Sequence, residues 1–289
     1  MRVLAVSFTS QHESGHPSGT LIATTSETSL SRRFARCIAK RFVNSSTRLR
    51  KRRNSSAGIV AIDITEADPF TGDRKGHEDE IIGTKENTDE YAYQWATVQL
   101  VGNAVPLVLD ARPVRMGETR LEIVEDLLDS AENLVHVDNV LMDREFDSQH
   151  VLEMISQRGL SYVVPKRMQT SEKAQAKRLL QRDQDRYETD RKLHLGDNEW
   201  HSTTLIYRRK ENSEHDDHRQ YSVFMTNTGS GHLTEYGYRW EIESGYKSIK
   251  RFMAATTSKD FGLRFFYFAF ACLLYSIWRG RSACAGRID

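Results

Sequence analysis

The chain has 289 residues, with 41 Lys and Arg against 40 Asp and Glu, so it can form one large domain or two small ones. Its balanced total charge does not exclude a nucleic-acid partner, because the distribution of charge along the chain matters more than the sum. Three scattered cysteines exclude a disulfide framework or a cysteine-based metal site and are typical of a reducing cytoplasm. The apolar run at the N-terminus is too short for a signal peptide.

The first 56 residues are predicted to be a basic, partly disordered arm. Residues 1–30 are rich in Ser, Thr and Gly and show no period. Residues 31–53 hold ten Lys or Arg and no acid, and they combine a short amphipathic helix with a final basic run. This pattern indicates an arm that binds DNA phosphates, with Arg52 and Arg53 among the contacts, although a solvated basic tail is an equal alternative.

The segment Gly58–Thr65 is β-branched and almost continuously apolar, which predicts a strand buried on both faces. Asp63 interrupts it. A lone carboxylate in a buried strand is costly unless it is paired or binds a metal, so Asp63 is a candidate ligand. The alternative is a carboxylate that caps the turn at a frayed strand end.

Two further strands are expected at residues 91–102 and 105–114, because Gly102-Asn103 is typical of a hairpin turn. Together with the first strand they predict a three-stranded meander. Asp110 lies inside the third strand and is interpreted as structural. The segment 68–84 is polar and rich in turn residues, and it predicts a solvated loop.

An amphipathic helix is predicted at residues 117–134 and a strand at 135–142. The strand ends at Asp143, and the carboxyl ends of strands are where α/β sheets place their ligands. Asp138 is a weaker alternative because it lies at the start of the strand. A helix at 148–158, ended by Gly159, and a strand at 162–165 follow.

Residues 168–230 are predicted to be a β-rich insertion. The segment starts with a highly charged stretch and continues with strands at 191–195, 201–208 and 220–226. About 100 residues separate Asp143 from Glu243, more than a compact core needs.

The segment Tyr236–Arg251 is predicted to be a helix with one charged face. At about 100° per residue, Tyr236, Arg239, Glu243 and Lys250 share one side along about 21 Å. The opposite side is suited to packing and carries Trp240, Ile242, Tyr246 and Ile249. An ordinary amphipathic helix with i,i+4 ion pairs is the alternative.

The apolar run Phe265–Trp278 has fourteen residues, whereas a membrane-spanning helix needs about twenty. It is therefore interpreted as a buried core helix within residues 259–279, and a membrane segment is the weaker alternative.

The spacing Tyr236-x2-Arg239-x3-Glu243-x6-Lys250 resembles the signature of insertion-sequence transposases of the DDE type, in the family numbered four. Asp143-Arg-Glu-Phe is similar to the Asp-Arg-Gly-Phe segment of that family, although Glu145 replaces the glycine. The resemblance extends over residues 58–279. It implies that Asp63, Asp143 and Glu243 are the catalytic carboxylates.

The same resemblance implies that Arg239 and Lys250 contact DNA phosphates and that Tyr236 supports this contact. Full-length relatives carry a longer helical DNA-binding region before the core, so the arm is expected to be truncated. Two Mg²⁺ ions, for which Mn²⁺ can substitute, fit this chemistry because Mg²⁺ prefers carboxylate oxygens. Asp63 is expected to bridge both ions, Asp143 to hold one and Glu243 the other.

The order β-β-β-α-β-α-β followed by helices is that of a ribonuclease H-like mixed α/β fold. The expected division is an arm at 1–56, a catalytic core at 57–167 and 231–280, an insertion at 168–230 and a tail at 281–289. The resemblance implies a cytoplasmic, nucleoid-associated prokaryotic transposase that binds double-stranded element-end and target DNA as a homodimer, with no membrane partner. A hydrolysis-only nuclease and an inactive DNA-binding remnant are the alternatives.

Overall fold

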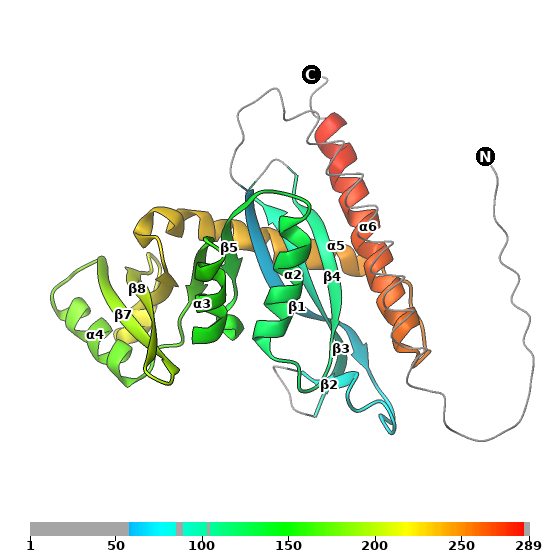
Figure 1. Ribbon diagram of the computed structural model, residues 1–289, viewed down its shortest axis with the longest axis horizontal. Coiled ribbons are helices and arrows are strands. Elements are labelled where there is room, and N and C mark those ends of the chain that lie inside the picture. The colour runs from blue at the N-terminus through cyan, green and yellow to red at the C-terminus, as the bar shows by residue number, and fades with distance from the viewer. Residues whose placement is uncertain (1–57, 85–88, 103–104, 286–289) are drawn as a thin grey trace, which may run out of the picture.

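The computed structural model of the chain describes residues 58–84, 89–102 and 105–285 (Figure 1). The predicted basic arm, with Arg52 and Arg53, lies outside these residues. In chain order the elements are β1 (Gly58–Phe70), β2 (Ile81–Gly83), β3 (Tyr91–Val101), β4 (Leu107–Val114), α2 (Arg120–Glu132), β5 (Val137–Met142), η1 (Arg144–Phe146), α3 (Gln149–Gln157), β6 (Ser161–Pro165), α4 (Thr170–Gln181), β7 (Arg186–Gly196), β8 (Glu199–Arg209), η2 (His218–Gln220), β9 (Tyr221–Thr226), η3 (Gly229–Arg239), α5 (Trp240–Phe252) and α6 (Phe261–Ala285).

The described strands form one nine-stranded sheet in the order β2-β3-β1-β5-β6-β9-β8-β7, with β4 also paired to β3. β1 is antiparallel to β3 and parallel to β5, and β6 is parallel to β5. The predicted meander β1-β3-β4 and the ribonuclease H-like mixed sheet are therefore confirmed. The short strand β2, which pairs with β3, was not predicted, because its three residues lie in a segment dominated by turn residues.

Helices cover both faces of the central sheet, which explains why β1 is apolar along most of its length (Figure 1). Val60, Ile62 and Ile64 face one core together with residues of α2 and α3. Ala61 faces a second core that contains residues of α5 and α6. Side chains alternate along a strand, so Asp63 points to the face covered by α5.

The segment predicted as an insertion continues the same sheet. β9 pairs with β6 in antiparallel register, and β8 and β7 follow outward as an antiparallel hairpin. The charged stretch that begins this segment forms the helix α4, which starts with a capping box between Gln169 and Glu172. β7 and β8 are longer than predicted, because their paired backbone extends beyond the apolar centres, whereas β9 keeps nearly the predicted bounds.

The segment expected to be one helix consists of two. Tyr236 and Arg239 lie in the 3-10 helix η3, and the α-helix α5 begins at Trp240. Residues three apart eclipse one another in a 3-10 helix, so these two side chains still face the same way. Ile242, Tyr246 and Ile249 are buried as predicted, but Trp240 is 63% exposed, since it lies at the first turn of α5 and not against the sheet.

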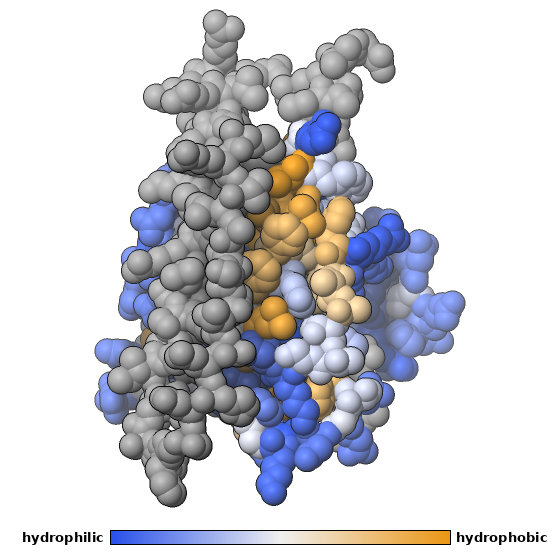
Figure 2. Space-filling model, turned by 90° about the vertical axis from the view of Figure 1, so that its right-hand side faces the viewer, coloured by the Kyte–Doolittle hydropathy of each residue, from blue (hydrophilic) through white to orange (hydrophobic). Residues whose placement is uncertain are grey.

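Helix α6 packs one face against the sheet and α5, and its buried side chains include Phe265, Phe268 and Tyr275. Its other face is exposed and includes Phe266 and Phe270. Figure 2 shows an apolar patch on this side of the protein. By length and composition alone α6 could also cross a membrane, but half of its most apolar window is buried inside the protein. The buried face of α6 agrees with its interpretation as a core helix.

Candidate active site

The pairing of β1 with β5 brings the first two predicted carboxylates together. Ile62 is in register with Met142 in this parallel pair, so the next residues along the two strands, Asp63 and Asp143, are neighbours. Asp63 is 8% exposed, and Asp143 follows directly where β5 ends. Asp138 lies at the opposite end of β5, beside His136, and is therefore remote from Asp63.

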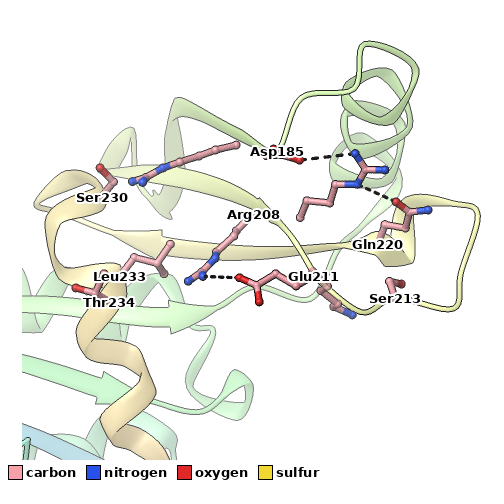
Figure 3. Close-up of a pocket in the computed structure, with 11 residues that line it drawn as sticks. Asp185, Arg208, Glu211, Ser213, Gln220, Ser230, Leu233 and Thr234 are labelled. Atoms are coloured by element: carbon pink, nitrogen blue, oxygen red, sulfur yellow. Dashed lines mark hydrogen bonds and ion pairs between the residues drawn. The ribbon is translucent and has the colours of Figure 1, made fainter.

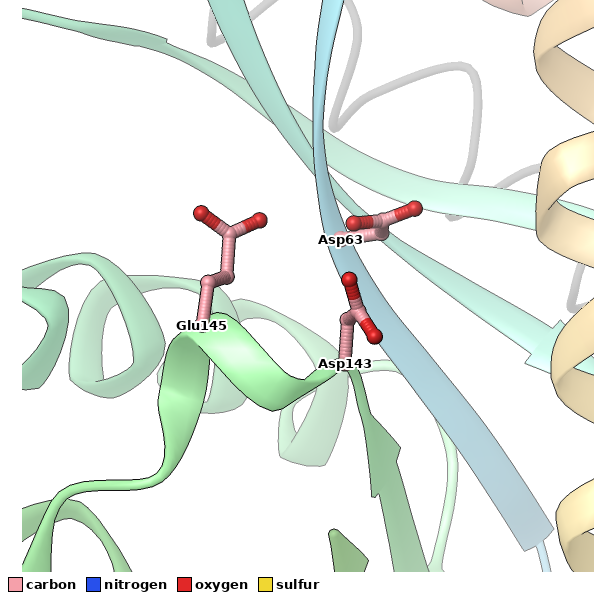
Figure 4. A group of neighbouring side chains, drawn as sticks. All are labelled: Asp63, Asp143 and Glu145. Carbon is pink, nitrogen blue, oxygen red and sulfur yellow. The ribbon is translucent and has the colours of Figure 1, made fainter. Parts of the chain in front are cut away.

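A third carboxylate joins this pair, and it is not the one that the sequence predicted. Asp63, Asp143 and Glu145 each present an oxygen within 4.8 Å of the others, and Figure 4 shows their side chains converging from β1 and η1. In the described part of the chain this is the one group of three acidic, His or Cys residues with such geometry. The only signal for Glu145 in the sequence was its place two residues after Asp143, where the resembling family has glycine.

Helix α5 is tied to β1 at the position of Asp63. The Tyr246 hydroxyl donates a hydrogen bond to the Asp63 carbonyl oxygen at 2.8 Å, and the Thr97 hydroxyl on β3 lies 2.7 Å from the same phenol. Burial, with Asp63 nearby, raises the pKa of Tyr246, so the phenol stays a neutral donor. This contact sets the register of α5 relative to the carboxylates.

Helix η3 is tied to β5 in the same manner. The Tyr236 hydroxyl donates to the Met142 carbonyl oxygen at 3.4 Å, one residue before Asp143, and Asn139 donates to the Glu235 carboxylate at 2.7 Å. Burial raises the pKa of Tyr236. The two helices of the signature segment are thus held by the two strands that carry the aspartates.

Arg239 lies between the strand carboxylates and α5. Its guanidinium is 3.9 Å from the Asp63 carboxylate and makes a close ion pair with Glu243 on the next helical turn. Burial alone would lower the pKa of Arg239, but Tyr236 and the carboxylates around it outweigh burial and raise that pKa. Arg239 is therefore a permanent cation at the edge of the acidic group.

Glu243 is placed beside the site through this arginine, but it is not one of the three carboxylates that converge. Lys250 is exposed on α5. The structure therefore brings together Asp63, Asp143, Arg239 and Tyr236 directly, and Glu243 through Arg239. The catalytic and DNA-binding roles assigned to these residues, and to Lys250, stay predictions.

Acidic groups outnumber basic groups here. Around Asp63 and Asp143 lie two more acids, Glu145 and Glu243, whereas the nearby cations are Arg239 and Arg120, which lies 3.0 Å from Glu145. The donors are carboxylate oxygens, which hard divalent cations such as Mg²⁺ and Mn²⁺ prefer. The residues present therefore fit a divalent metal site.

A cleft lies in the β7–β9 extension of the sheet. It measures about 680 Å³ and lies between the β7–β8 hairpin and η3, whose Ser230 and Thr234 form one wall (Figure 3). Four cationic side chains and two acidic ones also line it: Arg186, Arg208, Arg209, Lys210, Asp185 and Glu211. Part of this charge is neutralised locally, because Arg209 pairs with Asp183 at 2.6 Å.

The sheet is mixed, and the neighbouring strands β1 and β5 bring Asp63 and Asp143 together. These features define a ribonuclease H-like domain with an acidic site. Residues 55–277 match the family described as the transposase DDE domain, and the chain belongs to this family.

Comparison with solved structures gives a similar fold in the cryo-EM structure of a piggyBac transposase synaptic complex with hairpin DNA. The TM-score is 0.51 at 12% sequence identity, over 80% of this chain and 49% of that one. The chain thus spans about half the length of that transposase. A comparison with the curated proteins finds no significant match.

Proposed function

We propose that the chain is a transposase that cleaves DNA at the ends of an insertion sequence of family four and joins the freed 3′-hydroxyl to target DNA. The observation that carries this proposal is the convergence of Asp63 and Asp143 beside the signature helices, in a chain of the transposase DDE family. The piggyBac structure contains DNA in a synaptic complex, which supports double-stranded DNA as partner.

Asp63 and Asp143 are proposed to hold two divalent cations, with Glu243 reaching the same ions from α5. Bound there, the ions supply an activated water or 3′-hydroxyl and a stabilised leaving oxygen. Arg239 is a planar donor that suits a phosphate, and the tie of Tyr236 to β5 keeps that donor beside the aspartates.

Further contacts with DNA are proposed on α5 and in the cleft beside η3. Lys250 is exposed on α5, and the cations Arg186, Arg208 and Lys210 line the cleft beside η3. Such side chains bind the phosphate backbone without regard to sequence. Two copies of the chain, in a prokaryotic cytoplasm, are proposed to bring two element ends together.

The test is a cleavage and joining assay with the whole chain. Linear DNA carrying the inverted repeats that flank its coding sequence is incubated with Mg²⁺ or Mn²⁺, and nicked and joined products are separated. Asp63→Asn, Asp143→Asn and Glu243→Gln are each expected to abolish cleavage and to unfold at the wild-type temperature. Normal cleavage by any of the three would show that its assignment is wrong.

The same assay separates the two alternatives. Cleavage without joined product would identify a nuclease that only hydrolyses. DNA binding without nicking, in either metal, would identify an inactive remnant.

A further inference from the structure

Glu145 is placed at the acidic site by the fold of the chain just after β5. The 3-10 turn η1 begins directly after Asp143, whose carbonyl accepts a hydrogen bond from the Phe146 amide at 3.1 Å. Phe146 is fully buried and anchors the turn in the core, while Asp147 is held by the Lys166 ammonium at 3.1 Å. The turn is fixed on both sides of Glu145, which directs its side chain back toward Asp63 and Asp143 (Figure 4).

The spacing of these three carboxylates suits a single divalent cation. Oxygen ligands lie about 2.0–2.1 Å from Mg²⁺ and about 2.3–2.6 Å from Ca²⁺, so ligands on opposite sides of such an ion are about 4–5 Å apart. The oxygens of Asp63, Asp143 and Glu145 already lie within 4.8 Å of one another. Only a small adjustment of side chains separates this arrangement from a coordination shell.

The partners of the two glutamates differ. Glu243 is paired with Arg239, four residues before it, and it is not one of the three carboxylates that lie together. Glu145 is paired with Arg120 at the start of α2, and it keeps this contact while one of its oxygens faces Asp63 and Asp143. The side chain of Glu145 is 14% exposed and that of Glu243 is 30% exposed.

We propose that Glu145 is an additional carboxylate ligand of one of the divalent cations held by Asp63 and Asp143. This inference depends on the metal site of the proposed function and adds a residue to it. The simpler role for Glu145 is a structural ion pair with Arg120, and the experiment below distinguishes the two roles.

The experiment titrates the whole chain with Mn²⁺ alone and measures free Mn²⁺ by electron paramagnetic resonance. We expect Glu145→Gln to weaken Mn²⁺ binding at least tenfold, since loss of even an outer-shell partner typically costs that much. Glu145→Asp, which keeps the charge on a shorter side chain, is expected to lose less. Glu132→Gln is the matched control. Glu132 forms an ion pair with Arg158, with a distance of 2.8 Å between the charged atoms, and this pair lies outside the acidic site. Loss of the Glu132 charge is therefore expected to leave Mn²⁺ binding unchanged.

Arg120→Gln removes the structural partner and keeps Glu145. A ligand role predicts Mn²⁺ binding at least as tight as in the wild type, whereas Glu145→Gln weakens it. If Glu145→Gln and Arg120→Gln lower the unfolding temperature equally and neither changes Mn²⁺ binding, Glu145 is only an ion-pair partner and the inference is wrong.

Asp63→Asn and Asp143→Asn separate this inference from the proposed function. Loss of Mn²⁺ binding in these variants, with wild-type binding in Glu145→Gln, overturns the role of Glu145 and leaves the metal site intact. Wild-type Mn²⁺ binding in all three variants shows that the ion binds elsewhere, and both the inference and the proposed metal site then fail.

Discussion

Strand β1 carries two aspartates that each face an arginine from a helix, and the two pairs differ in their surroundings. Asp68 pairs with Arg264 of α6 at 2.6 Å, and the same guanidinium also donates to the backbone oxygens of Ser258 and Thr256. Asp63 lies 3.9 Å from Arg239, which is shared with Glu243.

Both pairs are largely buried, so burial does not separate them. The difference is charge balance: one acid meets one arginine at Asp68, whereas Asp63 stands among three further acids, Asp143, Glu145 and Glu243. A pair of one acid and one arginine balances its own charge, whereas a surplus of carboxylates leaves charge for a cation to neutralise. Surplus charge, and not burial, therefore distinguishes the candidate site from the structural pair.

The largest expected effect is on catalysis. Asp63→Asn should reduce metal-dependent cleavage by about 10³-fold or more, because the metal contributes several kcal/mol of stabilisation at about 1.4 kcal/mol per tenfold in rate. Asp68→Asn is the matched change on the same strand and should leave cleavage within a few-fold of wild type. Rates measured on one end-labelled substrate check both, and equal losses in the two variants would remove the distinction between the pairs.

Loss of the arginine should affect stability more at the balanced pair. Arg264→Met leaves the largely buried side chain of Asp68 without its cation and is expected to lower the free energy of unfolding by about 3 kcal/mol. Urea denaturation measures this loss.

Arg239→Met sharpens the comparison through its response to metal. Saturating Mn²⁺ should restore the stability of Arg239→Met toward the wild type, because the ion replaces the missing positive charge. The loss in free energy of unfolding of Arg264→Met relative to the wild type should be the same with and without Mn²⁺. Rescue of Arg264→Met by the metal would contradict the assignment of that pair as purely structural.

A smaller effect is expected at the exposed end of α5. Lys250→Ala should weaken binding to any DNA duplex and reduce the slope of log K against log salt by about one, as for the loss of one phosphate contact. Binding isotherms at several salt concentrations give the slope. An unchanged slope would count against a phosphate contact at this position.

The smallest expected effect is a pH dependence at the balanced pair. Burial raises the pKa of Asp68 above its ordinary 3.8, although Arg264 opposes this. The folded state then binds the proton more tightly than the unfolded state, so stability from this group falls as pH rises from about 3.8 through the raised pKa. Asp68→Asn should therefore gain stability relative to wild type across that window, as measured by urea denaturation at each pH. A loss of stability of Asp68→Asn relative to the wild type across this pH range would contradict the prediction.

Much of the core could be predicted because its signals are local. The apolar run of β1, the place of Asp143 at the end of β5 and the spacing of Arg239 and Glu243 each depend on residues close in the chain. In these segments the spacing of apolar residues along the sequence agrees with which side chains are buried in the fold. The parallel pairing of β1 with β5 then follows from the order of the elements.

Other features were decided by contacts between distant parts of the chain. The sequence alone determined most of the strands and helices and marked Asp63 and Asp143 as candidate metal ligands. Tertiary structure decided that β9 pairs with β6, that Trp240 faces solvent and that Glu145 meets Asp63. The reason is that the spacing of apolar residues along a segment indicates its secondary structure. The neighbours of a residue across a sheet or a turn depend instead on how all the elements pack together.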